Sequence, residues 1–266
     1  MSERTVMQLL TDQKRGHTPS SYTDLRKPNE NEWFIMQDVR LCEPVPRGSL
    51  DWKRKVAAAL ADIHTDNFKC TDQIPCLPHA DKEYWDYITM QISVDHFEKQ
   101  CEKDNVFAKK YAGMLPKLHR CAEAFVQDLT ALYREGSSLT AMHGDLQSID
   151  GDHVRCFQGK PMIIDWGFSQ YAPFYIDLVD YFTPEEALFY LEELHHRGGF
   201  SAKMILRSVT VSLPVIRHLS TCIRRSCSIT GETVRGSILC WQSSAGIDDQ
   251  LSAHFKHHMA LSQGLP

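Results

Sequence analysis

Hydrophobic residues recur at helical spacing through much of the chain. A short helix is predicted from Ser2 to about Lys14, where Gly16 ends it, and a second helix begins at Ser49. The apolar residues that define these two helices, three or four positions apart, are Val6, Leu9, Leu10, Trp52, Val56, Leu60 and Ile63. The same periodicity predicts further helices over residues 81–100, 116–136, 184–196, 202–225, 232–242 and 248–262.

Short apolar runs in the middle of the chain predict strands instead. Leu139–Met142 is one such run, and Val154–Phe157 and Met162–Ile164 are joined by Gln158-Gly159-Lys160, which is typical of a hairpin. Residues 33–36, Trp-Phe-Ile-Met, predict another buried strand. The pattern as a whole predicts an α+β protein, mostly helical, with a small hairpin in its middle.

Composition narrows the class of protein. The 266 residues suffice for one large domain or two small lobes, and 42% hydrophobic with 24% charged residues is ordinary for a globular protein. The net charge of −5 gives no reason to expect nucleic acid or an anionic membrane as a partner, and no apolar run reaches the length of a membrane span. Nine cysteines without a C-x-x-C pair favour a reducing compartment, so we expect a cytoplasmic protein without a signal peptide.

Acidic residues follow two of the predicted central strands. Asp145 lies in the run His-Gly-Asp-Leu directly after the strand at 139–142, and Asp165 lies in Ile-Ile-Asp-Trp-Gly where the hairpin ends. A hairpin of this length brings the two loops together. Two carboxylates that converge at strand ends suit a site for Mg²⁺ and phosphate.

The spacing of these motifs matches phosphoryl-transfer enzymes. Protein kinases carry H-R-D-x-x-x-x-N followed by D-F-G. Here His143-x-Asp145 is followed by Asp150 in place of the Asn, and Asp165-Trp166-Gly167 stands in place of D-F-G. Together with Asp177-Leu178 further on, the H-G-D-L and I-I-D-W motifs resemble the aminoglycoside phosphotransferase and choline kinase-like family, which are small-molecule kinases with a protein-kinase-like fold.

The resemblance extends over about residues 1–200. Glu3–Leu10 looks like the family's helix C, and Ala57–His64 looks like its A-x-L-A-x-L-H helix. Residues 33–39 look like the strand that enters the hinge, which implies that Gln37, Asp38 and Val39 hold the adenine of ATP through their backbone.

The resemblance implies a role for each motif residue. Asp145 would be the base that accepts a proton from a substrate hydroxyl, His143 would brace the loop, and Asp177 would position it.

The resemblance implies one metal ligand, Asp165, and leaves two candidates for the second. Asp165 would bind the Mg²⁺ that bridges the phosphates, and Asp150 would be a second ligand with one more negative charge than the usual Asn. If residues 149–151 are an insertion, His153 takes that second position, although imidazole is a poorer ligand for a hard ion such as Mg²⁺.

The N-terminal region departs from the family pattern. Only 32 residues precede Trp33, and they contain a single glycine, Gly16, so we expect no Gly-rich loop and no strand-borne Lys to pair with Glu3. Either the chain lacks the first strands of the N-lobe, or Lys14, Arg15 or a partner supplies the missing cation. We therefore predict a two-lobed fold with a truncated N-lobe at 1–39 and a helical C-lobe at 40–266 that contains the catalytic hairpin at 139–167, and a homodimer would cover the incomplete lobe.

Two function classes follow. The first is ATP- and Mg²⁺-dependent phosphoryl transfer to a hydroxyl of a small molecule; the alternative is a degenerate kinase fold, a pseudokinase, that binds a ligand or partner without transfer. A cationic substrate would fit an acidic helix face, although a merely solvated face is the favoured interpretation; its residues are Asp180, Glu185, Glu186, Glu192 and Glu193. A third, weaker hypothesis is a metal-binding helical protein that uses His195, His196, His254, His257 and His258.

Overall fold

The computed structural model describes eight stretches of the chain: residues 3–22, 35–46, 48–68, 77, 80–136, 138–146, 153–183 and 185–198. The helices predicted over 202–225, 232–242 and 248–262 lie outside these stretches, as do Asp150 and the histidines from His254 onward.

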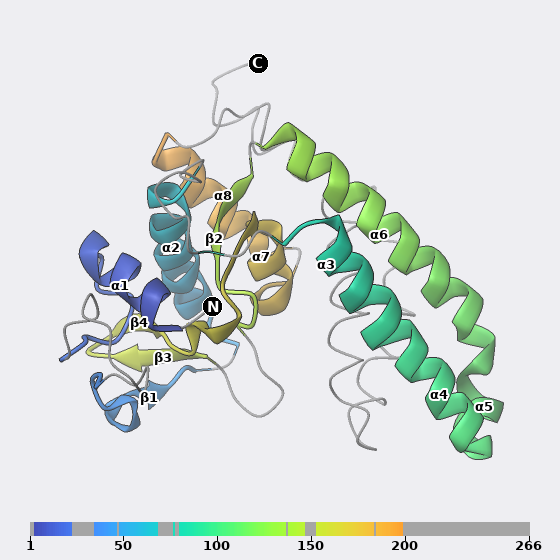
Figure 1. The fold of residues 1–266 in the computed structure, drawn as a ribbon. Helices are drawn as coiled ribbons and strands as arrows, with labels where there is room; N and C mark the ends of the chain where they lie inside the picture. The colour runs from blue at the N-terminus through green and yellow to red at the C-terminus, as the bar shows by residue number, and fades with distance from the viewer. Residues whose placement is uncertain are drawn as a thin grey trace, which may run out of the picture.

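The molecule has a body and a long helical arm, as Figure 1 shows. The arm consists of α3 (Lys82–Asp86), a π-helical turn (Tyr87–Val94), α4 (Asp95–Lys103), α5 (Asn105–Tyr111) and a 3₁₀ turn (Ala112–Met114), which lead into α6 (Leu115–Glu135). Pro116 lies in the first turn of α6, and Gly136 ends the helix with φ of 65°, so both predicted boundaries are confirmed.

The core of the body lies between α2 (Leu50–Asp66) and α8 (Ala187–His196), with α1 (Glu3–Gln13) beside the central strands (Figure 1). Ser49 caps α2 by accepting a hydrogen bond from the backbone of Trp52. The apolar faces predicted for α1 and α2 are confirmed. Leu9 is partly buried against the core, and the other predicted apolar side chains are fully buried: Val6, Leu10, Trp52, Val56, Leu60 and Ile63.

Two small antiparallel sheets carry the central motifs. In one, β1 (Glu43–Pro44) pairs with β3 (Val154–Phe157), which pairs with β4 (Lys160–Ile163); in the other, β2 (Leu139–Met142) pairs with β5 (Gln170–Pro173). Gln158 and Gly159, both at positive φ, form the hairpin turn, so Lys160 belongs to the strand and the predicted three-residue link is one residue too long. The sequence patterns missed β5 and α7 (Tyr175–Tyr181).

The buried strand predicted at residues 33–36 is described only at Ile35 and Met36, which pair with Ser21 and Tyr22 but do not form a buried strand. Ile35 is 54% exposed, and Met36 forms a single bridge with Ser21. After Met36 the chain turns into a 3₁₀ helix (Val39–Leu41), because the Asp38 carboxylate accepts a hydrogen bond from the backbone of Arg40.

None of the helices in the described stretches has the length and apolar character needed to cross a bilayer.

Candidate functional site

The catalytic-loop motif is held from behind by one buried carboxylate. Asp177, on α7, is fully buried and accepts hydrogen bonds from the backbone N–H groups of His143 and Gly144, both at 2.8 Å. Both oxygens are therefore used to fix the turn that follows β2. These contacts support the positioning role expected for Asp177.

His64 completes the environment of Asp177. Its Nε2 donates to Asp177 at 3.1 Å, since a carboxylate only accepts, and its Nδ1 lies 2.7 Å from the hydroxyl of Tyr190 on α8. Thr140, on β2, donates to the backbone carbonyl of His64. Burial opposes ionisation of Asp177, but the hydrogen bond from His64, together with the N–H of Gly144, outweighs it and holds the pKa of Asp177 below its usual value.

We call this group of five residues the Asp177 cluster: His64, His143, Gly144, Asp177 and Tyr190. Motif matching had singled out only part of it. The sequence did not predict a role for Tyr190. A helical apolar pattern cannot distinguish a buried Tyr that only packs from one whose hydroxyl also donates a hydrogen bond. His64 had a signal, since it ends the helix that resembles the family's A-x-L-A-x-L-H segment.

His143 links the two motif loops. It is fully buried, its Nε2 lies 2.8 Å from the carbonyl oxygen of Ile164, and its Nδ1 accepts from the N–H of Asp145 at 3.2 Å. A carbonyl oxygen only accepts, so Nε2 carries the proton. Burial lowers the pKa of His143, which favours this neutral ring, and the contacts support the bracing role expected for it.

Gly144 fits a position that other residues cannot occupy. Its φ is +86°, and a Cβ there would lie 2.8 Å from the carbonyl oxygen of Phe168. Both the left-handed backbone and this close approach require glycine. The H-G-D motif, where protein kinases have H-R-D, thus reflects the contact between the two loops.

Trp166 anchors the second motif. It is buried, its ring packs edge-on against His143 with centroids 4.7 Å apart, and its Nε1 donates to the carbonyl of Ile163. Its backbone N–H donates to the carboxylate of Glu3 at 3.3 Å, and burial raises the pKa of Glu3. The helix-C interpretation places Glu3 beside this motif, where the structure finds it, and in the described stretches no Lys or Arg forms an ion pair with Glu3.

Asp145 and Asp165 face each other across His153. The Asp145 side chain is 32% exposed and that of Asp165 55% exposed. His153 Nδ1 lies 3.7 Å from the Asp145 carboxylate and also bonds to the backbone carbonyl of Asp145, while its Nε2 lies 3.5 Å from the Asp165 carboxylate. The structure thus brings Asp145, Asp165 and the alternative ligand His153 together; we call Asp145 and Asp165 the carboxylate pair.

Asp165 has an unusual backbone for a non-glycine residue. Its φ of 61° and ψ of 65° are left-handed, a conformation that Asp and Asn tolerate better than most residues. Such strain is typical of functional sites, where the surroundings hold a side chain in one direction.

A metal ion at this site would have few protein ligands. In the part of the chain that the structure describes, no three His, Cys, Asp or Glu side chains converge on one metal position. The Asp165 carboxylate lies 3.5 Å and the Asp145 carboxylate 3.7 Å from a ring nitrogen of His153. Mg²⁺ is commonly bound by one or two carboxylates together with substrate phosphates, so the exposed Asp165 carboxylate fits this mode.

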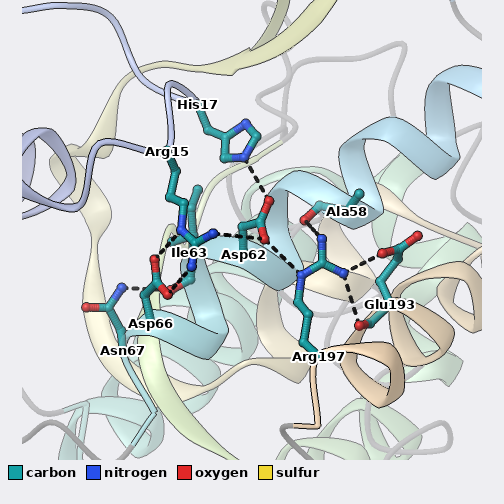
Figure 2. A network of polar contacts seen from close by, with 9 residues as sticks. All are labelled: Arg15, His17, Ala58, Asp62, Ile63, Asp66, Asn67, Glu193 and Arg197. Carbon is teal, nitrogen blue, oxygen red and sulfur yellow. Dashed lines mark hydrogen bonds and ion pairs between the residues drawn. The ribbon is translucent and has the colours of Figure 1, made fainter.

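Arg15 does not supply the missing phosphate-binding cation. Its guanidinium binds both oxygens of Asp66 at 2.7 Å and lies 3.8 Å from Asp62, as Figure 2 shows. Asp62 also binds His17 and Arg197, so the network joins the segment after α1 to α2 and α8. Arg15 is committed to structure, and the expectation that it takes over the role of the Lys is wrong on this geometry.

The predicted hinge residues lie next to the first sheet. The N–H of Gln37 donates to the carbonyl of Ser20, and the carbonyl of Val39 accepts from Cys42. Asp38 binds Arg40 through its side chain. Two of the backbone groups expected to bind adenine are thus already paired, and adenine binding by Gln37, Asp38 and Val39 stays a prediction.

Three of the five carboxylates of the predicted acidic face have cations beside them. Glu186 pairs with Lys53 at 3.3 Å, Glu192 pairs with Arg54 at 3.6 Å, and Glu193 binds Arg197 (Figure 2). These three carboxylates already have cations beside them, so this face offers them poorly to a cationic substrate.

The described cysteines, at positions 42, 101, 121 and 156, are free thiols.

Comparisons with known proteins identify the fold. No protein-family model matches the chain, and no curated protein matches it in sequence. Among solved structures, it is similar to the spectinomycin phosphotransferase APH(9)-Ia in its AMP-bound complex, with 15% identity, a TM-score of 0.57 and coverage of 92% of this chain and 81% of that one. The same enzyme in complex with ADP and spectinomycin matches with 14% identity and a TM-score of 0.58, over 91% of this chain and 78% of that one.

An aminoglycoside phosphotransferase from Alicyclobacillus acidocaldarius matches with 13% identity and a TM-score of 0.60, over 97% of this chain and 84% of that one. At such low identity the likeness speaks for the fold. It confirms the architecture expected from the H-G-D-L and I-I-D-W motifs. The chain has the α+β, protein-kinase-like fold of the aminoglycoside phosphotransferases.

Proposed function

We propose that this chain transfers the γ-phosphate of ATP to a hydroxyl group of a small molecule. The observation that supports this most directly is the placement of Asp145 and Asp165 on two interlocked loops, on either side of His153. Asp145 would accept the proton of the attacking hydroxyl, and Asp165 would bind the divalent ion. That ion, Mg²⁺ in the simplest case, would supply charge neutralisation of the phosphates when bound.

The solved neighbours support the same reaction class. APH(9)-Ia binds AMP in one structure, and ADP together with spectinomycin in another. A nucleotide and a hydroxyl-bearing small molecule are therefore the two ligands we propose for this chain. A cytoplasmic location belongs to the same proposal.

Nucleotide binding is the first test. Mg²⁺-ATP at millimolar concentration should raise the melting temperature, and Asp165→Asn should abolish that rise. Asn is chosen because it tolerates the left-handed backbone of Asp165, so the variant removes charge without adding backbone strain. Asp86→Asn, which removes an exposed carboxylate paired with Lys82 on the arm, is the matched control and should retain the full rise. If wild type shows no rise, the proposed function is wrong for this chain.

A second candidate, ligand binding without phosphoryl transfer, is favoured by one observation. Arg15 is bound by α2, and in the described stretches no Lys or Arg forms an ion pair with Glu3, so the Lys–Glu pair that neutralises phosphates in kinases has no counterpart there. Electrostatic stabilisation is usually the largest contribution to catalysis, and its loss would leave binding without turnover. A rise in melting temperature with Mg²⁺-ATP, but no phosphate transfer to any hydroxyl acceptor, would favour this candidate.

The division into 1–39 and 40–266 and the homodimer stay predictions. Tyr22 and Ile35 lie on the paired segments of the N-terminal part and are 71% and 54% exposed, as an apolar surface for a second copy would require. Sedimentation analysis of wild type and of Tyr22→Ser, Ile35→Ser would test it: the variant should shift a dimer toward monomer.

A further inference from the structure

The backbone on both sides of Asp165 is held by the N-terminal part of the chain. The N–H of Ile163, two residues before Asp165, donates to the carbonyl of His17 at 2.7 Å. The N–H of Trp166, directly after Asp165, donates to the carboxylate of Glu3 at 3.3 Å. Because the backbone of Asp165 is left-handed, these two contacts help to fix the direction in which its carboxylate points.

Two side chains directly after α1 fasten this part of the chain to α2. Arg15 binds both oxygens of Asp66 at 2.7 Å, and Nε2 of His17 donates to Asp62 at 3.2 Å, since a carboxylate only accepts (Figure 2). We call these contacts of Arg15 and His17 with α2 the N-terminal anchor. His17 thus contacts α2 through its side chain and the strand before Asp165 through its backbone.

The part of α2 that receives the anchor is itself fixed in the body of the molecule. Asp62 also binds Arg197, at the end of α8, at 2.9 Å, and Arg197 donates to the carbonyl of Ala58 at 3.2 Å (Figure 2). The side-chain amides of Gln13 and Asn67 bond to each other at 2.8 and 3.3 Å. The contacts therefore run without a break from α8 through α2 and the N-terminal segment to the strand that precedes Asp165.

We propose that Arg15 and His17 are positioning residues for Asp165. They fix the N-terminal segment on α2, and that segment holds the peptide groups on either side of Asp165 in place. Groups that orient a metal-binding side chain contribute to metal affinity without touching the ion. The inference deepens the proposed function and rests on it, because the binding of a divalent ion by Asp165 is part of that proposal.

The exposure of Arg15 makes a local effect measurable. Its side chain is 47% exposed, and an ion pair of this kind adds little to the stability of a whole protein. Loss of the pair should therefore loosen what the N-terminal segment holds and leave the remaining core intact. This separates a positioning role from a general contribution to folding.

Amide hydrogen exchange of the full chain without ligand tests the inference, because it reports local opening at single residues. In Arg15→Gln we expect the amides of Ile163 and Trp166 to exchange about fivefold faster than in wild type. The amides of His143 and Gly144, which donate to a buried carboxylate, are internal references and should change by less than about twofold.

Arg54→Gln is the matched control. Arg54 is 59% exposed and pairs with Glu192 between α2 and α8 at 3.6 Å, so the variant removes a similar ion pair outside the anchor and should leave all of these amides unchanged. Arg15→Lys keeps the charge but loses the paired hydrogen bonds, so its exchange should lie between wild type and Arg15→Gln. Wild type in about 1 M NaCl, which screens an exposed ion pair, repeats the test without any variant.

A second measurement connects the anchor to the ion. The Mg²⁺ concentration that gives half of the ATP-dependent rise in melting temperature should be about fivefold higher in Arg15→Gln than in wild type. The same concentration should be unchanged in Arg54→Gln, because the peptide groups beside Asp165 keep their partners there.

The outcomes separate the inference from the proposed function. Equal acceleration of exchange at Ile163, Trp166, His143 and Gly144 in Arg15→Gln indicates a general loss of stability and overturns the positioning role. Unchanged exchange at Ile163 and Trp166, or an unchanged Mg²⁺ requirement, overturns it as well. If wild type shows no rise in melting temperature with Mg²⁺-ATP, while Arg15→Gln accelerates exchange at Ile163 and Trp166 alone, the proposed function is wrong and the anchoring of the Asp165 backbone is supported.

Discussion

The two sides of the catalytic loop differ in how completely their polar groups are paired. Behind the loop, the Asp177 cluster is buried, and Asp177 accepts from three donors at 2.8–3.1 Å. In front, Asp145 and Asp165 are partly exposed and lie 3.5–3.7 Å from the nearest nitrogens of His153. The polar groups behind the loop are therefore closely paired, whereas the two carboxylates in front of it are partly exposed and lie beyond good hydrogen-bond distance of His153.

This difference separates what stabilises the protein from what could act on a ligand. A buried polar group that loses its hydrogen-bond partner destabilises the fold by its full desolvation free energy, so changes behind the loop should reduce the free energy of unfolding. Exposed carboxylates interact weakly with their neighbours, so changes in front should cost little. The expected effects below run from the largest to the smallest.

The largest effect is expected from Asp177→Ala. The variant leaves the N–H groups of His143 and Gly144 and the ring of His64 without their acceptor in a buried place. We expect the free energy of unfolding to fall by about 4 kcal/mol in urea titrations, as when one partner of a buried pair is removed. Asp86→Asn, an exposed carboxylate, should change it by less than about 0.5 kcal/mol. A loss below about 1 kcal/mol for Asp177→Ala would contradict the comparison.

The second largest loss in the free energy of unfolding is expected from Gly144→Ala, because Gly144 lies where the Asp177 cluster meets the loop that carries Asp165. The left-handed backbone costs about 1 kcal/mol for any residue with a Cβ, and the contact with Phe168 at 2.8 Å should bring the total to about 3 kcal/mol. Gly159→Ala is the matched control: its φ is +75°, but nothing lies within 4 Å of the added Cβ. The difference between the two variants measures the loop contact, and equal losses would show that this contact is unimportant.

The third effect is a dependence of stability on pH that arises behind the loop. Burial lowers the pKa of His143, so below its unfolded value of about 6.5 the unfolded chain binds more protons than the folded one. Stability should therefore fall as the pH drops below about 6.5, by up to about 1.4 kcal/mol per pH unit. The lowered pKa of Asp177 acts in the same direction but only below about pH 4, where the unfolded carboxyl becomes protonated.

Urea unfolding at pH 7.5, 6.5 and 5.5 measures this slope. His143→Gln removes the titrating ring, so the part of the slope due to His143 should disappear even if the variant is less stable at every pH. An unchanged slope in His143→Gln would assign the acid sensitivity to other groups.

The sequence predicted the front of the site better than the rear. Asp145 and Asp165 follow strands in short motifs, and local spacing is enough to bring such loops together. His64 lies 113 residues before Asp177 and 126 residues before Tyr190, the two residues it contacts, and periodicity says only that such residues face the core. The motif at the end of α2 pointed to His64, but nothing local in the sequence pointed to Tyr190 as its partner.

The errors of sequence reasoning also have physical causes. The strand at 33–36 was predicted from an apolar run, but Ile35 lies on an edge with its side chain exposed, where β-propensity decides little. Arg15 was a candidate cation because of its charge alone, and only the structure shows that two carboxylates one turn apart on α2 bind it. β5 was missed because its polar and aromatic residues do not alternate clearly.

The smallest effect on stability is expected at the front, from Asp145→Asn. Asp145 lies 3.7 Å from His153 and is partly exposed, so the free energy of unfolding should change by no more than about 0.5 kcal/mol. The same variant should lower phosphoryl transfer by about 10³-fold, because the amide cannot accept the hydroxyl proton. The two measurements belong together: urea titration for stability, and transfer from radiolabelled ATP to an acceptor for rate. A variant that transfers phosphate at more than half the wild-type rate would remove Asp145 as the base. A stability loss above about 2 kcal/mol would instead show that the front, like the rear, is part of what holds the fold together.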